Sequence, residues 1–341
     1  MRSVKRLAVV CVLLLLAACG GTAAGSLPTP ATASSPGLKS DTWTWDGAAF
    51  HAAGVTGPPA RDLPALAFDA ARHVYVMFGG QAPSGYFGDT WTWNGSAWKQ
   101  MSPTHRPPAR KGASMAFDPV RQVVELYGGQ AEDQVEGTTS GDTWTWDGND
   151  WTEADAGPGA PDVRDGARMV TAGDRVLLFG GRHFNVDYFG DAYTWDGKRW
   201  TRADAAPRPP GRVGAAVVWD PVHSALFVFG GAGFNAEGGS GAAGTPLADA
   251  WSLTGRRWTS LPAAGPPALA FPVGMWDARA QRVVVLFGLK CPDPSADAWA
   301  WDGAAWTRLA STGVPARWGA ALAQDTNGGA LLFGGSDQRG C

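Results

Sequence analysis

Short apolar runs separated by glycine-rich turns recur along most of this chain. One run covers residues 74–78 and is followed by Gly79 and Gly80. A short apolar run bounded by glycine is typical of a buried β-strand. Comparable runs end at six glycines that lie about 50 residues apart: Gly79, Gly128, Gly180, Gly230, Gly288 and Gly334. The pattern predicts an array of internal repeats with several short strands in each.

A second recurring pattern alternates polar and aromatic positions. Asp89 begins the segment Asp-Thr-Trp-Thr-Trp, whose period of two places Trp91 and Trp93 on one face of a strand. Asn94 and Gly95 then give a strong hairpin signal before the next aromatic residue. The pattern begins at six aspartates: Asp41, Asp89, Asp142, Asp191, Asp249 and Asp297. Together the two patterns predict four antiparallel strands in every repeat.

Residues 41–341 resemble the kelch family, because the glycine pair after the second strand, the aromatic of the third and the tryptophan of the fourth fall where kelch repeats place them. The resemblance implies an all-β, six-bladed β-propeller with four antiparallel strands per blade. Residues 41–50 supply strands three and four, and residues 317–335 supply strands one and two. We expect these half-blades to pair and close the ring. Leu289 stands where the pattern expects a second glycine.

The N-terminal segment has the features of an export signal. Basic residues precede an apolar stretch over residues 7–18, which is too short to span a bilayer, and Leu-Ala-Ala-Cys19 follows. This resembles the leader of bacterial lipoproteins, in which the cysteine carries the lipid. We therefore expect a signal peptide at 1–18, lipidation at Cys19, a flexible tether at 19–40 and display on the outer face of the bacterial cell membrane. The alternative is an ordinary secretory leader with an incidental cysteine.

Composition and charge narrow the functional classes. The chain has 341 residues, 47 glycines and a net charge of −3, without a clustered basic excess. This argues against general nucleic-acid binding. The five histidines are scattered among different strands, turns and loops of the predicted repeats. We predict no metal site, no cofactor and no catalytic residue set, since no nucleophile triad or phosphate-binding loop is present.

The predicted binding face is the one that carries the connections between strands two and three. These loops differ in length from repeat to repeat, and variable loops on a rigid scaffold commonly carry binding function. The alternative is that their aromatic side chains fold back and anchor the loops. The candidate binding residues in these loops are Tyr86, Phe87, Phe184, Asn185, Tyr188 and Phe234.

An arginine precedes the first strand in five repeats. The residues are Arg61, Arg110, Arg164, Arg212 and Arg317, whereas the fifth repeat has Leu269 at this place. Guanidinium groups at one mouth of the central channel would suit carboxylates of acidic peptides or acidic sugars. The alternative is that each arginine forms a structural ion pair with the aspartate that begins strand three.

These observations predict a non-catalytic binding module whose ligand is a protein, an acidic peptide or a glycan. Kelch propellers also include bacterial sialic acid mutarotases, so a carbohydrate-active enzyme of that kind is the alternative. The two cysteines of the predicted propeller, Cys291 and Cys341, follow equivalent glycine positions in neighbouring blades. Export permits a disulfide between them, and two free thiols are the alternative.

Overall fold

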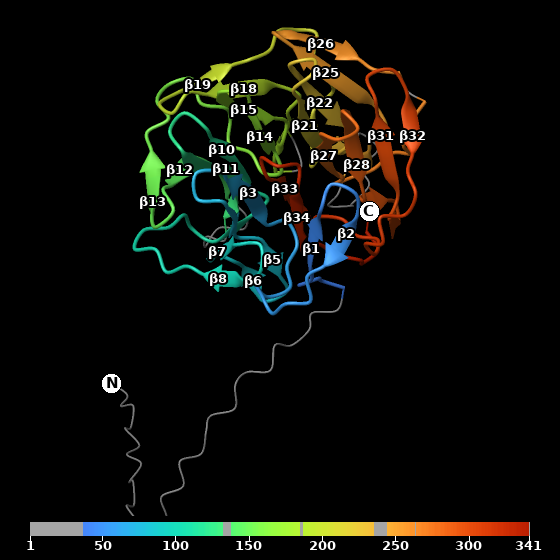
Figure 1. Ribbon diagram of the computed structural model, residues 1–341. Coiled ribbons are helices and arrows are strands. Elements are labelled where there is room, and N and C mark those ends of the chain that lie inside the picture. Colours follow the sequence, from blue (N-terminus) through green and yellow to red (C-terminus); the bar gives the residue numbers. More distant parts are fainter. Residues whose placement is uncertain (1–36, 132–137, 185–186, 235–243, 263, 341) are drawn as a thin grey trace, which may run out of the picture. The chain divides into compact units, whose positions relative to one another are not determined.

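The computed structural model describes residues 37–131, 138–184, 187–234, 244–262 and 264–340. All regular secondary structure in these residues is β-strand, and the strands pair antiparallel (Figure 1). No helix in the described residues is long and apolar enough to cross a membrane. The predicted signal peptide, Cys19, Asn185 and Cys341 lie outside the described residues.

Most described strands belong to six four-stranded arrays, which we number sheets I to VI. In sheets I to V, the four strands lie side by side in the order in which they follow one another along the chain. Sheet I contains β3 (Ala65–Asp69), β4 (Val74–Phe78), β7 (Thr90–Trp93) and β8 (Trp98–Gln100). Sheet II contains β10 (Ser114–Asp118), β11 (Val123–Ala131), β12 (Thr139–Trp146) and β13 (Trp151–Ala154), with β9 (Arg110–Lys111) on β11. Sheet III contains β14 (Arg168–Ala172), β15 (Arg175–Phe179), β18 (Ala192–Trp195) and β19 (Trp200–Arg202).

Sheets IV and V repeat the same order. Sheet IV contains β21 (Ala216–Asp220), β22 (Ala225–Phe229), β25 (Ala250–Thr254) and β26 (Arg257–Ser260). Sheet V contains β27 (Val273–Asp277), β28 (Arg282–Leu286), β31 (Ala298–Trp301) and β32 (Trp306–Arg308).

Sheet VI joins the two ends of the described chain. It consists of β33 (Ala321–Gln324), β34 (Ala330–Phe333), β1 (Thr42–Trp45) and β2 (Phe50–Ala52). Strand β1 pairs with β34 from Thr42 opposite Phe333 to Trp45 opposite Ala330. Contacts between the N-terminal and C-terminal segments begin before residue 41. Leu38 forms a β-bridge with Ser336, and Lys39 forms an ion pair with Asp337. Residues 37–40, which the sequence assigned to the tether, therefore contact the C-terminal segment.

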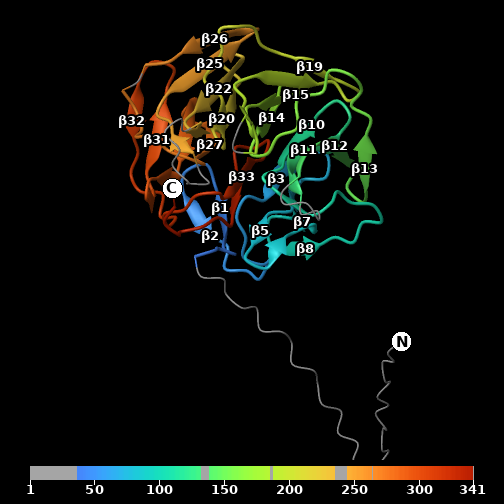
Figure 2. The same ribbon diagram turned by 180° about the vertical axis from the view of Figure 1, so that it is seen from behind.

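The first strands of the sheets lie around a common centre. Strands β3, β10, β14, β21, β27 and β33 contact one another in this order, and β33 contacts β3. Figure 1 labels all six strands, and Figure 2 shows them from the other side. In sheets I, II and III, the tryptophan of the fourth strand donates to a threonine in the third strand of the neighbouring sheet. The Nε1 of Trp151 donates to Thr90 Oγ1 at 2.9 Å, and the Nε1 of Trp200 to Thr143 Oγ1 at 3.0 Å. The recurring tryptophan thus packs between sheets.

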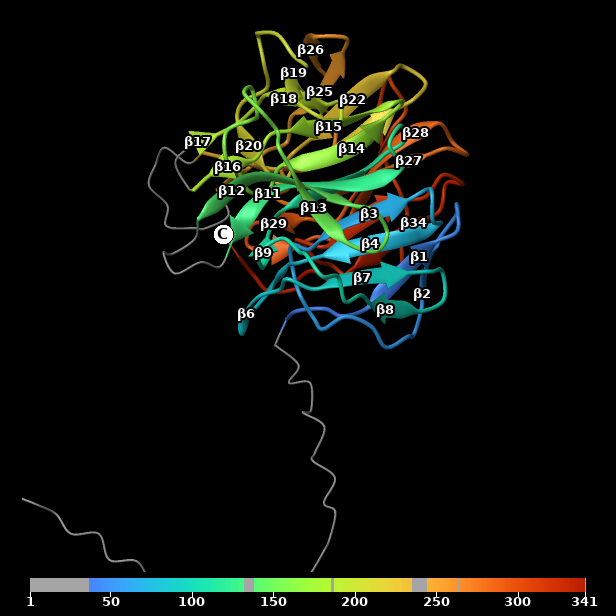
Figure 3. The ribbon, with the colours of Figure 1, turned by 90° about the vertical axis from the view of Figure 1, so that its left-hand side faces the viewer.

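The two faces around this centre differ. Short hairpins that connect the second and third strands lie on one face, which we call the loop face. They are β5 (Gln81–Ala82) with β6 (Gly85–Tyr86), β16 (Arg182–His183) with β17 (Asp187–Tyr188), β23 (Ala232–Gly233) with β24 (Thr245–Pro246), and β29 (Leu289–Lys290) with β30 (Asp293–Pro294). Strand β20 (Arg212–Val213), which precedes the first strand of sheet IV, pairs with β23. Figure 3 shows β16, β17 and β29 on its left side. The opposite face carries the turns between first and second strands, and we call it the turn face.

The alignment of the fifth repeat requires a correction. The backbone N–H of Gly80 donates to the carbonyl of Arg110, and the N–H of Gly288 donates to the equivalent carbonyl of Arg317. Gly288 is therefore the second glycine of its pair, and Phe287, with a φ of 58°, occupies the first glycine's place. Leu289 begins the loop hairpin instead of replacing a glycine.

Candidate functional site

The arginine before each first strand is buried in a set of hydrogen bonds. The Arg61 side chain is 0 % exposed, and its Nη1 and Nη2 lie 2.6 and 2.9 Å from the two carboxylate oxygens of Asp89. Its Nη1 also donates to the carbonyl of Gly79 at 2.9 Å, and its Nε to the carbonyl of Pro59 at 3.0 Å. The guanidinium therefore joins the loop before strand one, the end of strand two and the start of strand three.

The same arrangement, which we call the clamp, occurs five times. In each of the other four pairs the arginine side chain is also 0 % exposed. These pairs are Arg110 with Asp142, Arg164 with Asp191, Arg212 with Asp249, and Arg317 with Asp41. These arginines cannot reach a ligand at the channel mouth, which corrects the predicted binding role of Arg61, Arg110, Arg164, Arg212 and Arg317. The structural ion pair, given as the alternative, describes their position.

The clamp also sets the charge state of the aspartates. Burial by itself would raise the pKa of Asp142, but the hydrogen bonds and charge of Arg110 outweigh it, so the pKa lies below its usual value. The same causes lower the pKa of Asp41 and Asp249 through Arg317 and Arg212. These aspartates are anionic partners of a buried cation and do not act as proton donors at neutral pH.

Sheet V holds its aspartate differently. Leu269 is buried at the place of the arginine, and Asp297 pairs instead with Arg308 from β32. The Arg308 side chain is 65 % exposed. The repeat without the buried arginine is also the repeat with Phe287 at the first glycine's place.

The aromatic loop residues divide into anchors and exposed groups. Phe87 lies 3.8 Å from the guanidinium carbon of Arg61, measured to its ring centroid, and Tyr86 lies 5.1 Å from the Nζ of Lys111. Phe184 and Phe234, by contrast, are 46 and 59 % exposed. Tyr188 packs edge-on against Phe234, with ring centroids 6.1 Å apart.

The exposed aromatics lie beside a hollow on the loop face. It has a volume of about 1090 Å³ and lies between the loops of sheets III and IV. We call it the loop hollow. Its polar residues are Asp162, His183 and Asp187, and no lysine or arginine is found among its described lining residues. Its aromatic and apolar walls are formed by Pro161, Val163, Tyr188, Phe189, Pro210, Phe234 and Leu247.

A ring of six residues narrows the central channel on the loop face. The residue two positions before each first strand has a positive φ between 51 and 66°: Leu63, Gly112, Gly166, Gly214, Phe271 and Gly319. Four backbone hydrogen bonds of 2.7 to 3.0 Å run from Gly319 through Leu63, Gly112 and Gly166 to Gly214. The side chains of Leu63, Val213, Phe271 and Trp318 pack together there. The ring and this apolar cluster lie across the loop-face end of the inner strands.

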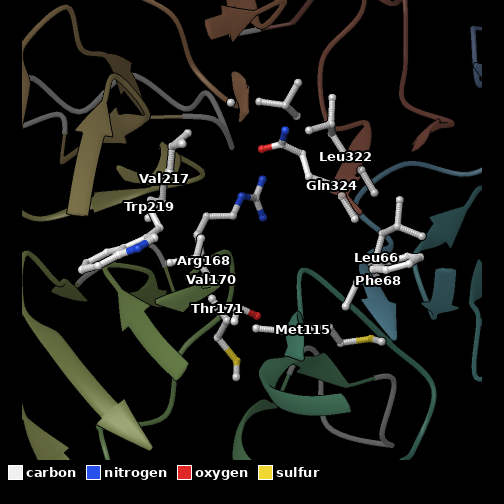
Figure 4. A pocket seen from close by; sticks show the side chains of 18 of the residues that line it. Leu66, Phe68, Met115, Arg168, Val170, Thr171, Val217, Trp219, Leu322 and Gln324 are labelled. Atoms are coloured by element: carbon white, nitrogen blue, oxygen red, sulfur yellow. The ribbon is translucent and has the colours of Figure 1, made fainter. Parts of the chain in front are cut away.

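Beyond the ring, the channel contains a cavity of about 380 Å³. We call it the central cavity. Its lining extends to Pro221, Ala278, Asp325 and Gly328 in the turns between first and second strands, so it reaches the turn face. Its walls are mainly apolar, and the side chain of Arg168 extends into it (Figure 4). Sequence reasoning missed Arg168, although it is the only charged residue at the first position of the six inner strands.

Four charged side chains gather beside the ring on the loop face. The Nε of Arg182 lies 3.4 Å from Asp165 Oδ1, and Lys111 interacts with both Asp165 and Asp62. Asp62 is buried, and its Oδ1 has no hydrogen-bond partner among the described residues. Burial raises the pKa of Asp62 to about 6, although Gln81 and Lys111 act in the opposite direction.

Comparison with known proteins gives the fold but no family. No family model and no curated protein matches the chain. Among solved structures, it is similar to YjhT with a TM-score of 0.60 and 15% sequence identity, over 80% of this chain and 93% of that chain. This chain has a β-propeller fold. At this identity, the likeness carries no activity or site.

Two further sequence predictions concern metal binding and the cysteines. In the described parts of the chain, no group of three or more His, Cys, Asp or Glu side chains could hold a metal ion. Cys291 is disulfide-bonded. The N–H of Gly340 donates to the carbonyl of Pro292 at 3.1 Å, and Arg339 pairs with Asp293. The C-terminal segment therefore lies against the loop of Cys291, and the bond to Cys341 stays a prediction.

Proposed function

We propose that this chain is an exported lipoprotein with a six-bladed, kelch-type propeller that binds a ligand at the loop hollow without transforming it. The observation that carries the proposal is the combination of exposed Phe234 and Phe184 with a hollow of about 1090 Å³ between the loops of sheets III and IV. A concave surface with aromatic walls and a few polar groups has the character of a ligand site.

The lining of the hollow favours a neutral glycan. It contains Asp162, Asp187 and His183 without a described lysine or arginine, so an acidic peptide or acidic sugar would lack a cationic partner. Aromatic rings such as Tyr188 and Phe234 offer flat apolar faces to the C–H surfaces of a sugar, and carboxylates accept hydrogen bonds from its hydroxyl groups. A neutral segment of a cell-envelope polysaccharide combines both features.

Six blades in one closed ring are supported by three features. Each of the sheets I to VI has the same four-strand order, the inner strands contact one another in sequence, and β33 contacts β3. In addition, β1 and β34 join the N- and C-terminal halves of sheet VI. This pairing would leave no open sheet edge between the ends of the chain.

Attachment to the membrane rests on the leader. Replacing Cys19 with serine should move the protein from the membrane fraction to the medium, as measured by fractionation and immunoblotting. A C19S protein that still sediments with membranes contradicts lipidation at Cys19.

Binding at the loop hollow is tested with a glycan array that carries neutral and acidic cell-envelope oligosaccharides. The wild type should bind neutral members, and Phe234→Ala combined with Tyr188→Ala should weaken this binding by about tenfold or more. The control is Val222→Ala, which removes an exposed apolar side chain from the turn face and should leave binding unchanged. Selective binding of acidic members, or binding that survives the double substitution, contradicts the proposal.

A mutarotase-like enzyme stays the alternative. It predicts that the purified protein accelerates interconversion of the anomers of a sugar such as sialic acid, which NMR follows directly. Our proposal predicts no acceleration above the rate in buffer.

A further inference from the structure

Arg168 breaks the symmetry of the inner strands. It pairs in the sheet with Phe179, and the equivalent inner-strand residues pair with Phe78, Tyr127, Phe229, Leu286 and Phe333. Those equivalent residues are small or apolar: Ala65, Ser114, Ala216, Val273 and Ala321. One of six symmetric positions therefore carries a cation into the central cavity. A site for one ligand on the axis of a repeated structure needs such an asymmetric feature.

The guanidinium of Arg168 has no partner among the described residues. No hydrogen bond or ion pair joins it to a carboxylate, and burial alone lowers the pKa of Arg168 to about 10. It remains cationic at neutral pH. Arg168 is half-buried, so a ligand can reach its guanidinium. An unpaired charge that is partly removed from water is costly, and an anion that entered the cavity would offset this cost.

The neighbouring polar groups are already engaged. The amide of Gln324 both accepts from and donates to the backbone of Trp276, at 2.6 Å in each case. Thr171 Oγ1 donates to the carbonyl of Phe117 at 2.7 Å. Gln324 and Thr171 are thus engaged with backbone groups, whereas the donors of the Arg168 guanidinium are free to meet a ligand (Figure 4).

The acidic group of the cavity is held at its far end. Asp325 lies in the turn after β33, where its Oδ1 accepts from the N–H groups of Asn327 and Gly329 and its Oδ2 from the hydroxyl of Tyr75. Both of its carboxyl oxygens are therefore engaged. A ligand carboxylate on Arg168 would therefore not compete with Asp325 for the same cation.

We propose that the central cavity binds a small monocarboxylate with an apolar body, whose carboxylate pairs with the Arg168 guanidinium. The planar guanidinium matches a carboxylate through two parallel hydrogen bonds. The apolar body would lie against Phe68, Trp219 and Trp276, which line the same cavity. A volume of about 380 Å³ suits a molecule with one ring or a short branched chain. This site is separate from the loop hollow and opens on the opposite face.

Benzoate and benzamide are matched probes for this site, because they share a ring and differ in charge. A ligand-observed NMR titration of the wild type should show saturable benzoate binding, about tenfold or more tighter than that of benzamide. Arg168→Met keeps side-chain length without the charge and should remove this preference. Arg168→Lys keeps the charge without the planar pair of donors and should bind benzoate with intermediate affinity.

Two controls separate this site from other effects. Phe234→Ala alters the loop hollow and should leave benzoate affinity unchanged, so failure of the glycan proposal and failure of this one are distinguishable. Near-UV circular dichroism and the melting temperature report folding, and Arg168→Met should melt no lower than wild type because no hydrogen bond or ion pair is lost and methionine keeps an apolar side chain of similar length. Absence of benzoate binding in the wild type, equal affinity for benzamide, or benzoate binding that Arg168→Met retains each overturns the proposal.

Discussion

Two arginine environments in this propeller have opposite character. Five arginines, of which Arg110 is an example, are fully buried, paired with an aspartate and repeated from sheet to sheet. Arg168 occurs once, lies in the central cavity and has no partner among the described residues. The difference indicates that repetition in this fold marks what holds each blade together. Arg168, which departs from the repeat without a structural partner, is the residue that we propose recognises a ligand.

The largest expected effect comes from breaking a clamp. Arg110→Met removes hydrogen bonds to Asp142 and to the carbonyls of Gly128 and Pro108. The unfolding free energy should fall by about 3 kcal/mol, because a buried charge pair loses one partner and backbone acceptors lose a donor. Equilibrium unfolding in urea measures it.

The matched control is Arg308→Met, since the Arg308 side chain is largely exposed and pairs with the aspartate of sheet V. It should cost less than about 1 kcal/mol. Equal losses in the two variants would show that burial does not distinguish the clamp.

The effect of Asp62 on the pH dependence of stability should be opposite in sign to that of a clamped aspartate. Its pKa is raised to about 6 by burial, so the folded state binds the proton more tightly than the unfolded state. This carboxyl therefore lowers stability as pH rises from about 4 to above 6. Asp62→Asn should raise the unfolding free energy by about 2 kcal/mol at pH 7.5 and change it little at pH 4. Thermal unfolding at both pH values measures it, with exposed Asp174→Asn as the control.

The clamped aspartates should make the protein sensitive to acid. The pKa of Asp41, Asp142 and Asp249 is lowered in the folded state, so their contribution is complete above the usual value of 3.8 and is lost as pH falls below it. Stability of the wild type should therefore decrease between about pH 4 and pH 2. Arg110→Met should show a shallower decrease in the same urea titrations, and an unchanged slope would contradict the role of Arg110.

The smallest expected effect is that of Arg168→Met on stability. Without a partner to lose, this substitution should leave the unfolding free energy unchanged or raise it by up to about 1 kcal/mol. A loss comparable to that of Arg110→Met would mean that Arg168 is a structural residue.

The sequence predicted the repeated features well and the unique ones poorly. The all-β repeats, their four strands and the pairing of the terminal strands follow from the spacing of Gly79, Trp91 and their equivalents, because local strand and turn chemistry sets them. The arginines could be read in two ways, since sequence spacing does not show whether Arg61 and Asp89 meet.

Other features depend on packing that a sequence pattern does not contain. Leu63 and Phe271 adopt positive φ without being glycine, so the ring of residues on the loop face has no sequence signal. The register of the fifth repeat has no sequence signal for the same reason, because Phe287 adopts a positive φ at the position of the first glycine. Arg168 could have been found by aligning the first positions of the inner strands, where it is the only charged residue.

The central claim is best tested by urea unfolding of wild type, Arg110→Met and Arg168→Met at neutral pH, each with and without benzoate. The account predicts that Arg110→Met loses about 3 kcal/mol yet keeps the stabilisation by benzoate. Arg168→Met should lose no stability and should no longer be stabilised by benzoate. Loss of stability in Arg168→Met together with retained stabilisation by benzoate would contradict it.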